Sequence, residues 1–204
     1  MEMRLSNSPG SRRSVRIIGG ELRSRLIEII DSEGLRPTPD RVRETLFNWL
    51  QHDLAGVRCL DLYAGTGVLG MEALSRGAGH VDLVESNRQV ASVLRDNVAK
   101  LINNNLGSSN VYNARAEDWL AQQMAGTGKY DLVFLDPPYE AQCLPAISKQ
   151  LDASSLLTPE ALIYLENDQP ISMQSLPSHW QCLKDKKAGQ VYYYLMQNKA
   201  PGIK

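Results

Sequence analysis

The chain has 204 residues, 43% of them hydrophobic, which is enough to bury one full core and too little for two independent domains. Its formal net charge of -1 gives no overall sign of a polyanionic partner, but the first 25 residues carry six arginines against two glutamates. A basic segment of this kind attracts a phosphate backbone. The alternative is a solvated chain end.

Several functional classes are excluded by what the sequence lacks. Its three cysteines are far apart and form no C-x-x-C pair, and its three histidines are isolated, so we expect no disulfide framework, no metal site and no covalent nucleophile. The polar start lacks the apolar core of a signal peptide, and no apolar run approaches the length of a membrane span. We therefore expect a cytoplasmic protein without a membrane partner.

The first elements expected are two short strands within residues 15–30, joined by a tight turn at Gly19-Gly20. A helix follows, with Thr38 as its N-cap and Pro39 as its first residue, because proline at that position has no N–H to leave unpaired. Apolar residues at helical spacing give it one core-facing side, and Gly56 is expected to end it.

From residue 57 the pattern alternates between strand and helix. Strands are expected at residues 59–62, 81–85, 110–112, 132–135 and 162–165, with a final hairpin of residues 181–184 and 191–196. Alternation of this kind predicts βαβ units and hence a mostly parallel sheet.

A glycine loop follows the first strand of this region. Gly65-Thr66-Gly67-Val68-Leu69-Gly70 matches G-x-G-x-x-G, and Glu85 ends the next strand twenty positions after Gly65. Taken literally this is the dinucleotide fingerprint, so a nicotinamide-dependent dehydrogenase is one interpretation. Asp61 argues against it, because an acid directly before the loop repels a pyrophosphate and attracts an ammonium or sulfonium group. S-adenosylmethionine carries both of these cations.

A second motif, Asp136-Pro137-Pro138-Tyr139, directly follows an apolar strand. The nitrogen of an exocyclic amine is a poor nucleophile because its lone pair is delocalised into the π-system. The Asp136 carboxylate and the Pro137 carbonyl can accept hydrogen bonds from both N–H groups of the amine and so turn its lone pair toward an incoming methyl group, while Tyr139 stacks on the base. The alternative is an ordinary strand-ending turn with a buried tyrosine.

Asp61-Leu62-Tyr63-Ala64-Gly65-Thr66-Gly67 resembles the cofactor loop of class I, Rossmann-like methyltransferases, and the Asp136 tetrapeptide resembles their amino-methylating signature. The resemblance implies an α/β fold with a mostly parallel seven-stranded sheet, an antiparallel C-terminal hairpin and a small N-terminal β-hairpin extension. It implies that Asp61 faces the methionine end of S-adenosylmethionine and that Glu85 binds the ribose. The other cofactor contacts implied are Tyr63, Ala64, Gly65, Gly67, Ser86, Arg115, Ala116 and Asp136. For Arg115 and Ala116 the alternative is a helix-start cap for the acids that follow them.

The series Arg16-Ile17-Ile18-Gly19-Gly20, Arg36-Pro37-Thr38 and residues 40–49, together with both core motifs, is similar to the bacterial small-subunit ribosomal RNA guanine-N2 methyltransferases. The similarity runs from about Arg16 through the final hairpin. It implies methylation of a guanine N2 in 16S ribosomal RNA, with RNA or the small ribosomal subunit as partner. It also implies a basic tail and hairpin in residues 1–30 that contacts RNA, followed by a methyltransferase domain in residues 31–204. We expect a monomer.

Candidate RNA contacts are Arg16, Arg23, Arg25, Arg36 and Thr38, for which solubility of an exposed hairpin and a plain helix cap are the alternatives. Arg41 and Arg43 equally fit a solvated helix face. Three other functions stay open from the residues alone. They are methylation of a DNA adenine or cytosine or a protein glutamine, the dehydrogenase, and a non-catalytic RNA-binding module.

Overall fold

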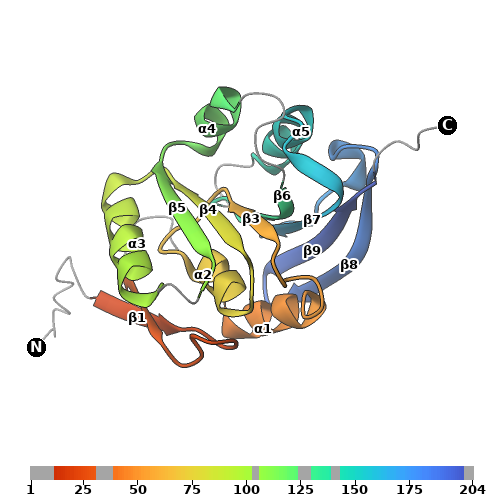
Figure 1. Cartoon of the computed structure of the whole chain (residues 1–204). Coiled ribbons are helices and arrows are strands. Elements are labelled where there is room, and N and C mark those ends of the chain that lie inside the picture. Colours follow the sequence, from red (N-terminus) through yellow and green to blue (C-terminus); the bar gives the residue numbers. More distant parts are fainter. Residues whose placement is uncertain (1–11, 31–38, 103–105, 124–129, 139–142, 200–204) are drawn as a thin grey trace, which may run out of the picture.

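The computed structural model describes residues 12–30, 39–102, 106–123, 130–138 and 143–199. A seven-stranded sheet lies at the centre of the molecule (Figure 1). Its strands are β3 (Arg58–Asp61), β4 (His80–Glu85), β5 (Ser108–Asn113), β6 (Tyr130–Leu135), β7 (Leu157–Asn167), β8 (Trp180–Ala188) and β9 (Val191–Asn198). Their order is β5-β4-β3-β6-β7-β9-β8, parallel as far as β7 and antiparallel where β9 joins β7 and β8. The predicted mostly parallel sheet with an antiparallel terminal hairpin is confirmed.

Helices cover both faces of this sheet (Figure 1). They are α1 (Asp40–Trp49), α2 (Val68–Ser75), α3 (Arg88–Leu101), α4 (Ala116–Gln122) and α5 (Leu144–Ala153), with a short 3-10 turn, η2, at Met173–Ser175. In β6, Leu132 and Phe134 pack in the core under α1, α2 and α3, whereas Val133 and Leu135 pack in the core under α4 and α5. Because both faces of the sheet are buried, the strand is apolar throughout instead of alternating with polar residues.

The order of the strands creates a switch point between β3 and β6. From β3 the chain continues to β4 and β5 on one side, whereas β6 and β7 lie on the other. In open α/β sheets, ligands bind beside the carboxyl ends of the strands at such a point. Asp61 pairs with Phe134 across it, two residues before Asp136. The two predicted motifs, which begin at Asp61 and Asp136, therefore start side by side.

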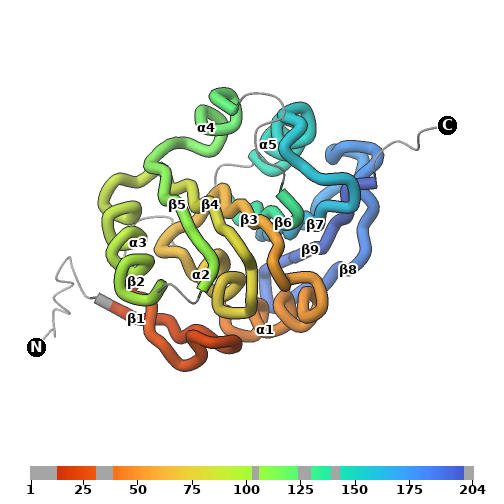
Figure 2. Tube along the Cα trace, viewed as in Figure 1, coloured from red at the N-terminus to blue at the C-terminus, as the bar shows by residue number. Residues whose placement is uncertain are grey.

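The N-terminal strands β1 (Arg12–Arg16) and β2 (Leu26–Ile30) pair antiparallel in a separate sheet, drawn in red in Figure 2. We call residues 12–30 the hairpin. The predicted tight turn at Gly19-Gly20 is wrong, because residues 17–25 form a longer connection that docks on the end of α2. Gly20 has φ 76°, and a Cβ there would lie 1.7 Å from the Ser75 carbonyl oxygen. The two glycines therefore allow close docking on a helix.

Helix α1 differs from its predicted limits. It begins at Asp40 with Pro39 as the N-cap, one residue later than expected. It ends at Trp49, and turns occupy the stretch up to Gly56, whose N–H donates to the Gly77 carbonyl. The prediction that Gly56 ends the helix is therefore wrong, while Thr38 lies outside the described residues.

Arg43 on α1 is completely buried, so a solvated helix face is the wrong description of it, whereas Arg41 is exposed. Arg43 Nη1 and Nη2 donate to the Arg16 carbonyl at 3.2 and 3.1 Å, and Nη2 pairs with Asp40 at 2.7 Å. Its Nη1 also lies 3.8 Å from the buried carboxylate of Glu72. A buried charge is tolerated only when it is paired in this way.

Glu72 joins the hairpin to α2. Its two carboxylate oxygens accept hydrogen bonds from the backbone N–H groups of Ile18 and Gly19, each at 2.8 Å. Arg76 Nε donates to the same carboxylate at 2.7 Å. The hairpin is thus fixed to the helix that starts at the glycine loop.

We expect Arg43→Met to lower the free energy of unfolding by about 3 kcal/mol or more, because removal of one partner leaves buried polar groups unpaired. Urea unfolding followed by circular dichroism measures this loss. Arg41→Met on the same helix is the matched control and should change stability by less than about 0.5 kcal/mol. Equal effects of the two substitutions would contradict a structural role for the buried network.

Candidate active site

Asp61 closes β3 and lies at the centre of the candidate site. Its carboxylate is 2% exposed and accepts a hydrogen bond from the Gly70 N–H at 3.2 Å. Burial raises the pKa of Asp61 to about 7, although hydrogen bonds from the backbone of Gly70 and Tyr63 oppose the rise. The nearby Glu85 carboxylate raises this pKa further. The ends of β3 and β4 thus hold two buried acidic groups whose negative charge is poorly compensated.

Glu85 closes the neighbouring strand β4 and is 8% exposed. Its Oε2 accepts a hydrogen bond from the Gly65 N–H at 3.0 Å, and its Oε1 accepts one from the Asn87 N–H at 2.6 Å. Burial raises the pKa of this carboxyl group as well. Glu85 therefore binds the glycine loop directly, and its predicted ribose contact stays a prediction.

The glycine loop is held to both neighbouring strands. Leu62 N–H donates to the Phe134 carbonyl at 3.2 Å, and Ala64 N–H donates to the Val84 carbonyl at 2.9 Å. Gly67 is the N-cap of α2 with φ 94°, a conformation that residues with a Cβ rarely adopt. This geometry places the start of α2 at the switch point, where the Gly70 N–H donates to Asp61.

Tyr63 precedes the loop and links it to the segment after the second motif. Its hydroxyl lies 3.5 Å from the Cys143 Sγ, directly before α5. Burial raises the pKa of the Tyr63 phenol above its ordinary value.

The second motif continues from β6 at the same edge of the sheet. Asp136 is half-buried, Pro137 is buried and Pro138 is exposed. Tyr139, the predicted stacking residue, lies outside the described residues. Sequence reasoning did not identify Glu166, which follows the Leu135 to Leu165 pair and is 2% exposed. In the sequence Glu166 directly follows the apolar run of residues 162–165; in the structure it lies within β7 and accepts a hydrogen bond from the Tyr164 hydroxyl at 2.6 Å.

The predicted adenine side lies after β5. Asn113 Nδ2 donates to the carbonyls of Glu85 and Ser86 at 2.8 and 3.0 Å, and thereby fixes the end of β4 beside β5. Ser86 itself is exposed.

Arg115 is the N-cap of α4, and Ala116 is buried as the first residue of that helix. The Arg115 Nε lies 3.6 Å from Glu117 and 3.9 Å from Asp118. Both acids lie in the first turn of α4, where the helix dipole favours them, and the Arg115 side chain makes no cap hydrogen bond. The adenine contact of Arg115 and Ala116 stays a prediction.

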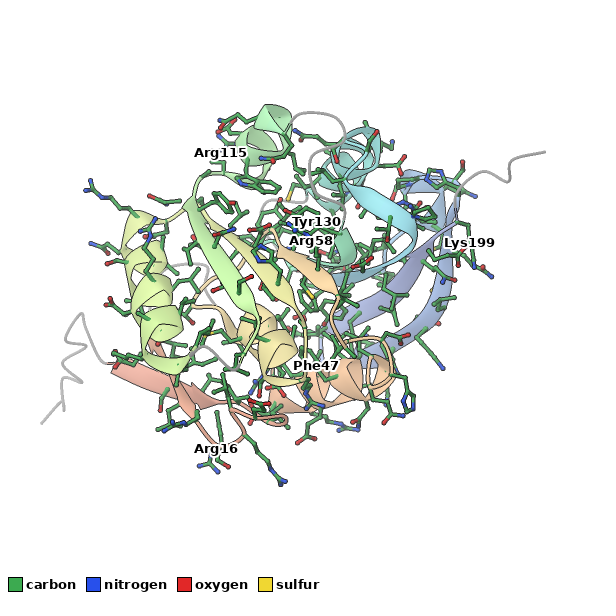
Figure 3. The ribbon with its side chains drawn as sticks, viewed as in Figure 1. Arg16, Phe47, Arg58, Arg115, Tyr130 and Lys199 are labelled. Atoms are coloured by element: carbon green, nitrogen blue, oxygen red, sulfur yellow. The ribbon has the colours of Figure 1, made fainter. Side chains whose placement is uncertain are left out.

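Arg16, Arg23 and Arg25 are exposed on the hairpin, and Figure 3 shows Arg16 at its outer edge. Arg23 and Arg25 lie in the connection that docks on Ser75, the end of α2 opposite the glycine loop. An eight-residue helix spans about 12 Å, so these two arginines lie well away from the switch point. Arg36 and Thr38 lie outside the described residues.

The residues of the switch point fit S-adenosylmethionine. Asp61 is a buried carboxylate with a raised pKa beside a second buried carboxylate, so a bound cation would offset an unfavourable charge there. In the described ranges, no group of three or more His, Cys, Asp or Glu side chains is placed to hold a metal ion. No helix of those ranges is long and apolar enough to cross a membrane.

Comparison with known proteins agrees with this geometry. Residues 15–197 match the family model described as Conserved hypothetical protein 95. The chain belongs to this family. The ribosomal RNA small subunit methyltransferase D of Escherichia coli strain K12 is 43% identical over 200 residues, 98% of each chain. The protein of the same name from Haemophilus influenzae is 40% identical over 196 residues, 96% of this chain and 100% of that one.

A solved structure supports the same assignment. The Escherichia coli protein yhhF superimposes with a TM-score of 0.80 at 40% identity, covering 92% of this chain and 99% of that one. Membership of the Conserved hypothetical protein 95 family, with relatives of this identity over nearly the whole chain, makes the protein a methyltransferase. The dehydrogenase interpretation of the glycine loop is therefore wrong.

Proposed function

We propose that the protein transfers a methyl group from S-adenosylmethionine to the N2 amine of a guanine in 16S ribosomal RNA. The observation that carries this proposal is the meeting of Asp61, Glu85 and the Asp136-Pro137 turn at the β3–β6 switch point. The relatives at 43% and 40% identity, whose names specify small-subunit ribosomal RNA, support the choice of substrate.

On the donor side, Asp61 and Glu85 are expected to hold the cofactor. The buried Asp61 carboxylate attracts the positively charged methionine end of the cofactor. Each Glu85 carboxylate oxygen already accepts one backbone hydrogen bond and has a further lone pair, which accepts a hydrogen bond from a ribose hydroxyl. S-adenosylmethionine, when bound, supplies an electrophilic methyl group. Tyr63, Ala64, Gly65, Gly67, Ser86, Arg115 and Ala116 complete the proposed contact set.

On the acceptor side, the Asp136 carboxylate and the Pro137 carbonyl each accept a hydrogen bond from one N–H of the guanine amine. This orients the nitrogen lone pair and offsets the positive charge that develops on the nitrogen during the transfer. The proline ring restricts its φ, so the turn is stiff before substrate binds. Tyr139 stacks on the base, and no covalent enzyme intermediate is required.

The hairpin is the proposed RNA contact, with residues 1–30 serving as the RNA-binding segment and residues 31–204 as the methyltransferase domain. Phosphate contacts position a nucleic acid without reading its bases, so arginines remote from the β3–β6 switch point are suited to this task. We place the enzyme in the cytoplasm as a monomer that requires no metal. Size-exclusion chromatography with light scattering tests the monomeric state.

The decisive experiment uses small ribosomal subunits from a strain that lacks the gene. Incubation with S-adenosylmethionine carrying a tritiated methyl group should label one guanine of 16S ribosomal RNA, located by primer extension and nuclease digestion. Labelling of double-stranded DNA or of protein under the same conditions, with no label in the ribosomal RNA, would overturn the proposal.

We expect the double substitution Arg23→Glu and Arg25→Glu to raise the KM for ribosomal subunits about tenfold or more, while kcat changes little. Loss of phosphate contacts should also flatten the dependence of RNA affinity on salt by about one unit of slope per contact. The double substitution Lys184→Glu and Lys186→Glu, two exposed changes on β8 with the same change in net charge, is the control. An equal rise in KM for both proteins would assign the effect to net charge instead of the hairpin.

A further inference from the structure

Asn97 on α3 is a buried polar residue that joins the hairpin to the glycine loop. It is 1% exposed, and its side-chain amide makes three hydrogen bonds. Oδ1 accepts from the Glu28 N–H at 3.0 Å, and Nδ2 donates to the Glu28 carbonyl at 2.9 Å. Nδ2 also donates to the Thr66 carbonyl at 3.1 Å. One amide therefore binds two segments that lie 69 and 31 positions away from it.

The Thr66 carbonyl belongs to a peptide group in the middle of the glycine loop. The N–H of the same peptide group is that of Gly67, which donates to the Ala64 carbonyl at 2.8 Å. Asn97 and Ala64 thus fix the peptide at both of its polar ends. Without Asn97 the buried Thr66 carbonyl has no comparable partner among the hydrogen bonds of the described residues, and a glycine neighbour allows the peptide to rotate.

Apolar contacts connect the same two regions. Ile17, Leu22 and Ile27 of the hairpin pack with Val68 and Met71 in one core cluster. Val68 and Met71 belong to the first turn of α2, directly after the glycine loop. The hairpin therefore packs along α2, from its first turn to Ser75 at its end, and is hydrogen-bonded through Asn97 to the loop that precedes the helix.

We propose that Asn97 is a positioning residue that couples RNA binding at the hairpin to cofactor binding at the glycine loop. This inference rests on the proposed function, because it takes the hairpin as the RNA contact and the loop as the cofactor contact. RNA bound to the docked hairpin adds contacts that further stabilise the Glu28 backbone and hence the Asn97 amide in this geometry. The Thr66 peptide is thereby held more firmly before the cofactor arrives, so the remaining entropic cost of ordering it opposes cofactor binding less.

Coupling of this kind is reciprocal, so the cofactor must strengthen RNA binding by the same factor. The test is filter binding of the full-length protein to small ribosomal subunits from a strain that lacks the gene, with and without saturating S-adenosylhomocysteine, which transfers no methyl group. For the unaltered protein we expect the dissociation constant to fall about fivefold when S-adenosylhomocysteine is present. An unchanged dissociation constant would overturn the coupling and needs no variant.

Asn97→Leu removes all three hydrogen bonds at similar side-chain volume and should reduce the fivefold difference to none. Ser75→Ala is the matched control, because Ser75 bonds the hairpin at Gly19 and Leu22 but makes no bond to the glycine loop. It should weaken the docking of the hairpin and keep the fivefold difference. Retention of that difference in Asn97→Leu, or its loss in Ser75→Ala alone, would overturn the role of Asn97.

Asn97→Ser provides a second variant with a smaller, still polar side chain if the leucine variant unfolds. It is too short to reach both partners, so the coupling should again be lost. The outcomes separate this inference from the proposed function. Normal methylation of 16S ribosomal RNA with no coupling overturns only the inference, whereas absence of any binding to the subunits overturns both.

Discussion

Asp136→Ala should lower kcat about 10²- to 10³-fold at saturating ribosomal subunits and cofactor, since it removes an acceptor that orients the amine and offsets its developing charge. The half-buried carboxylate is only partly enclosed by protein, so folding should be little affected. Single-turnover transfer of a tritiated methyl group measures the effect on the chemical step. Near-normal turnover of this variant would refute the proposed role of Asp136.

Asp136→Asn separates orientation from proton removal. Asparagine retains one acceptor oxygen of similar placement but is not a base at neutral pH. If Asp136 mainly orients the amine, this variant should keep at least about a tenth of the activity, because the methylated aminium can lose its proton to water. Activity as low as that of the alanine variant would assign proton removal to the carboxylate.

Asp61→Asn should weaken the binding of S-adenosylmethionine about 10²- to 10³-fold, because it removes a buried negative charge from a site that receives a cation. Gly70 N–H can still donate to the asparagine oxygen, so the loop keeps its local hydrogen bond. Calorimetry measures the change in affinity. Asp53→Asn, an exposed substitution, is the control. Unchanged affinity in the Asp61 variant would show that the cation lies elsewhere.

The same substitution should stabilise the cofactor-free protein at alkaline pH. The pKa of Asp61 rises from 3.8 to about 7 in the folded state, so the folded protein binds the proton more tightly than the unfolded chain. Stability contributed by this group is therefore present at low pH and lost between about pH 4 and pH 7. We expect the asparagine variant to be about 2 to 4 kcal/mol more stable at pH 8 and little changed at pH 4.

Cofactor affinity should follow the same titration. Because a bound cation lowers the pKa of Asp61, binding at pH 6 releases a proton, and affinity should be about tenfold weaker there than at pH 8. The pH dependence of cofactor affinity should be smaller in Asp61→Asn. This difference separates the titration of Asp61 from that of the cofactor's own amino group. Equal pH dependence in both proteins would contradict the link to Asp61.

Much of the main domain could be predicted because strong local signals agree with the global fold. The apolar strands, the glycine loop and the acids that close β3 and β4 each have a period or spacing that only one arrangement satisfies. The two motifs follow strands that flank a switch point, so their proximity also follows from the chain order.

The remaining features depend on contacts between distant segments, which local patterns do not record. Arg43 looks like a surface residue beside Arg41, yet it is buried because the Arg16 carbonyl of the hairpin, Asp40 and Glu72 all pair with its guanidinium group. Asn97 interrupts the apolar stripe of α3 between Leu94 and Leu101, a polar residue at a core position. A polar residue at this core position of the helix was the signal in the sequence that Asn97 makes buried hydrogen bonds.

The docking of the hairpin also sets an order of events during synthesis. Glu28 meets its partner 69 positions later, and Gly19 meets Glu72 53 positions later. About seventy further residues must therefore be synthesised after the hairpin before these contacts can form. Until α3 leaves the ribosome, the arginines proposed to hold RNA are exposed beside a large ribonucleoprotein and are not yet held in place by the fold.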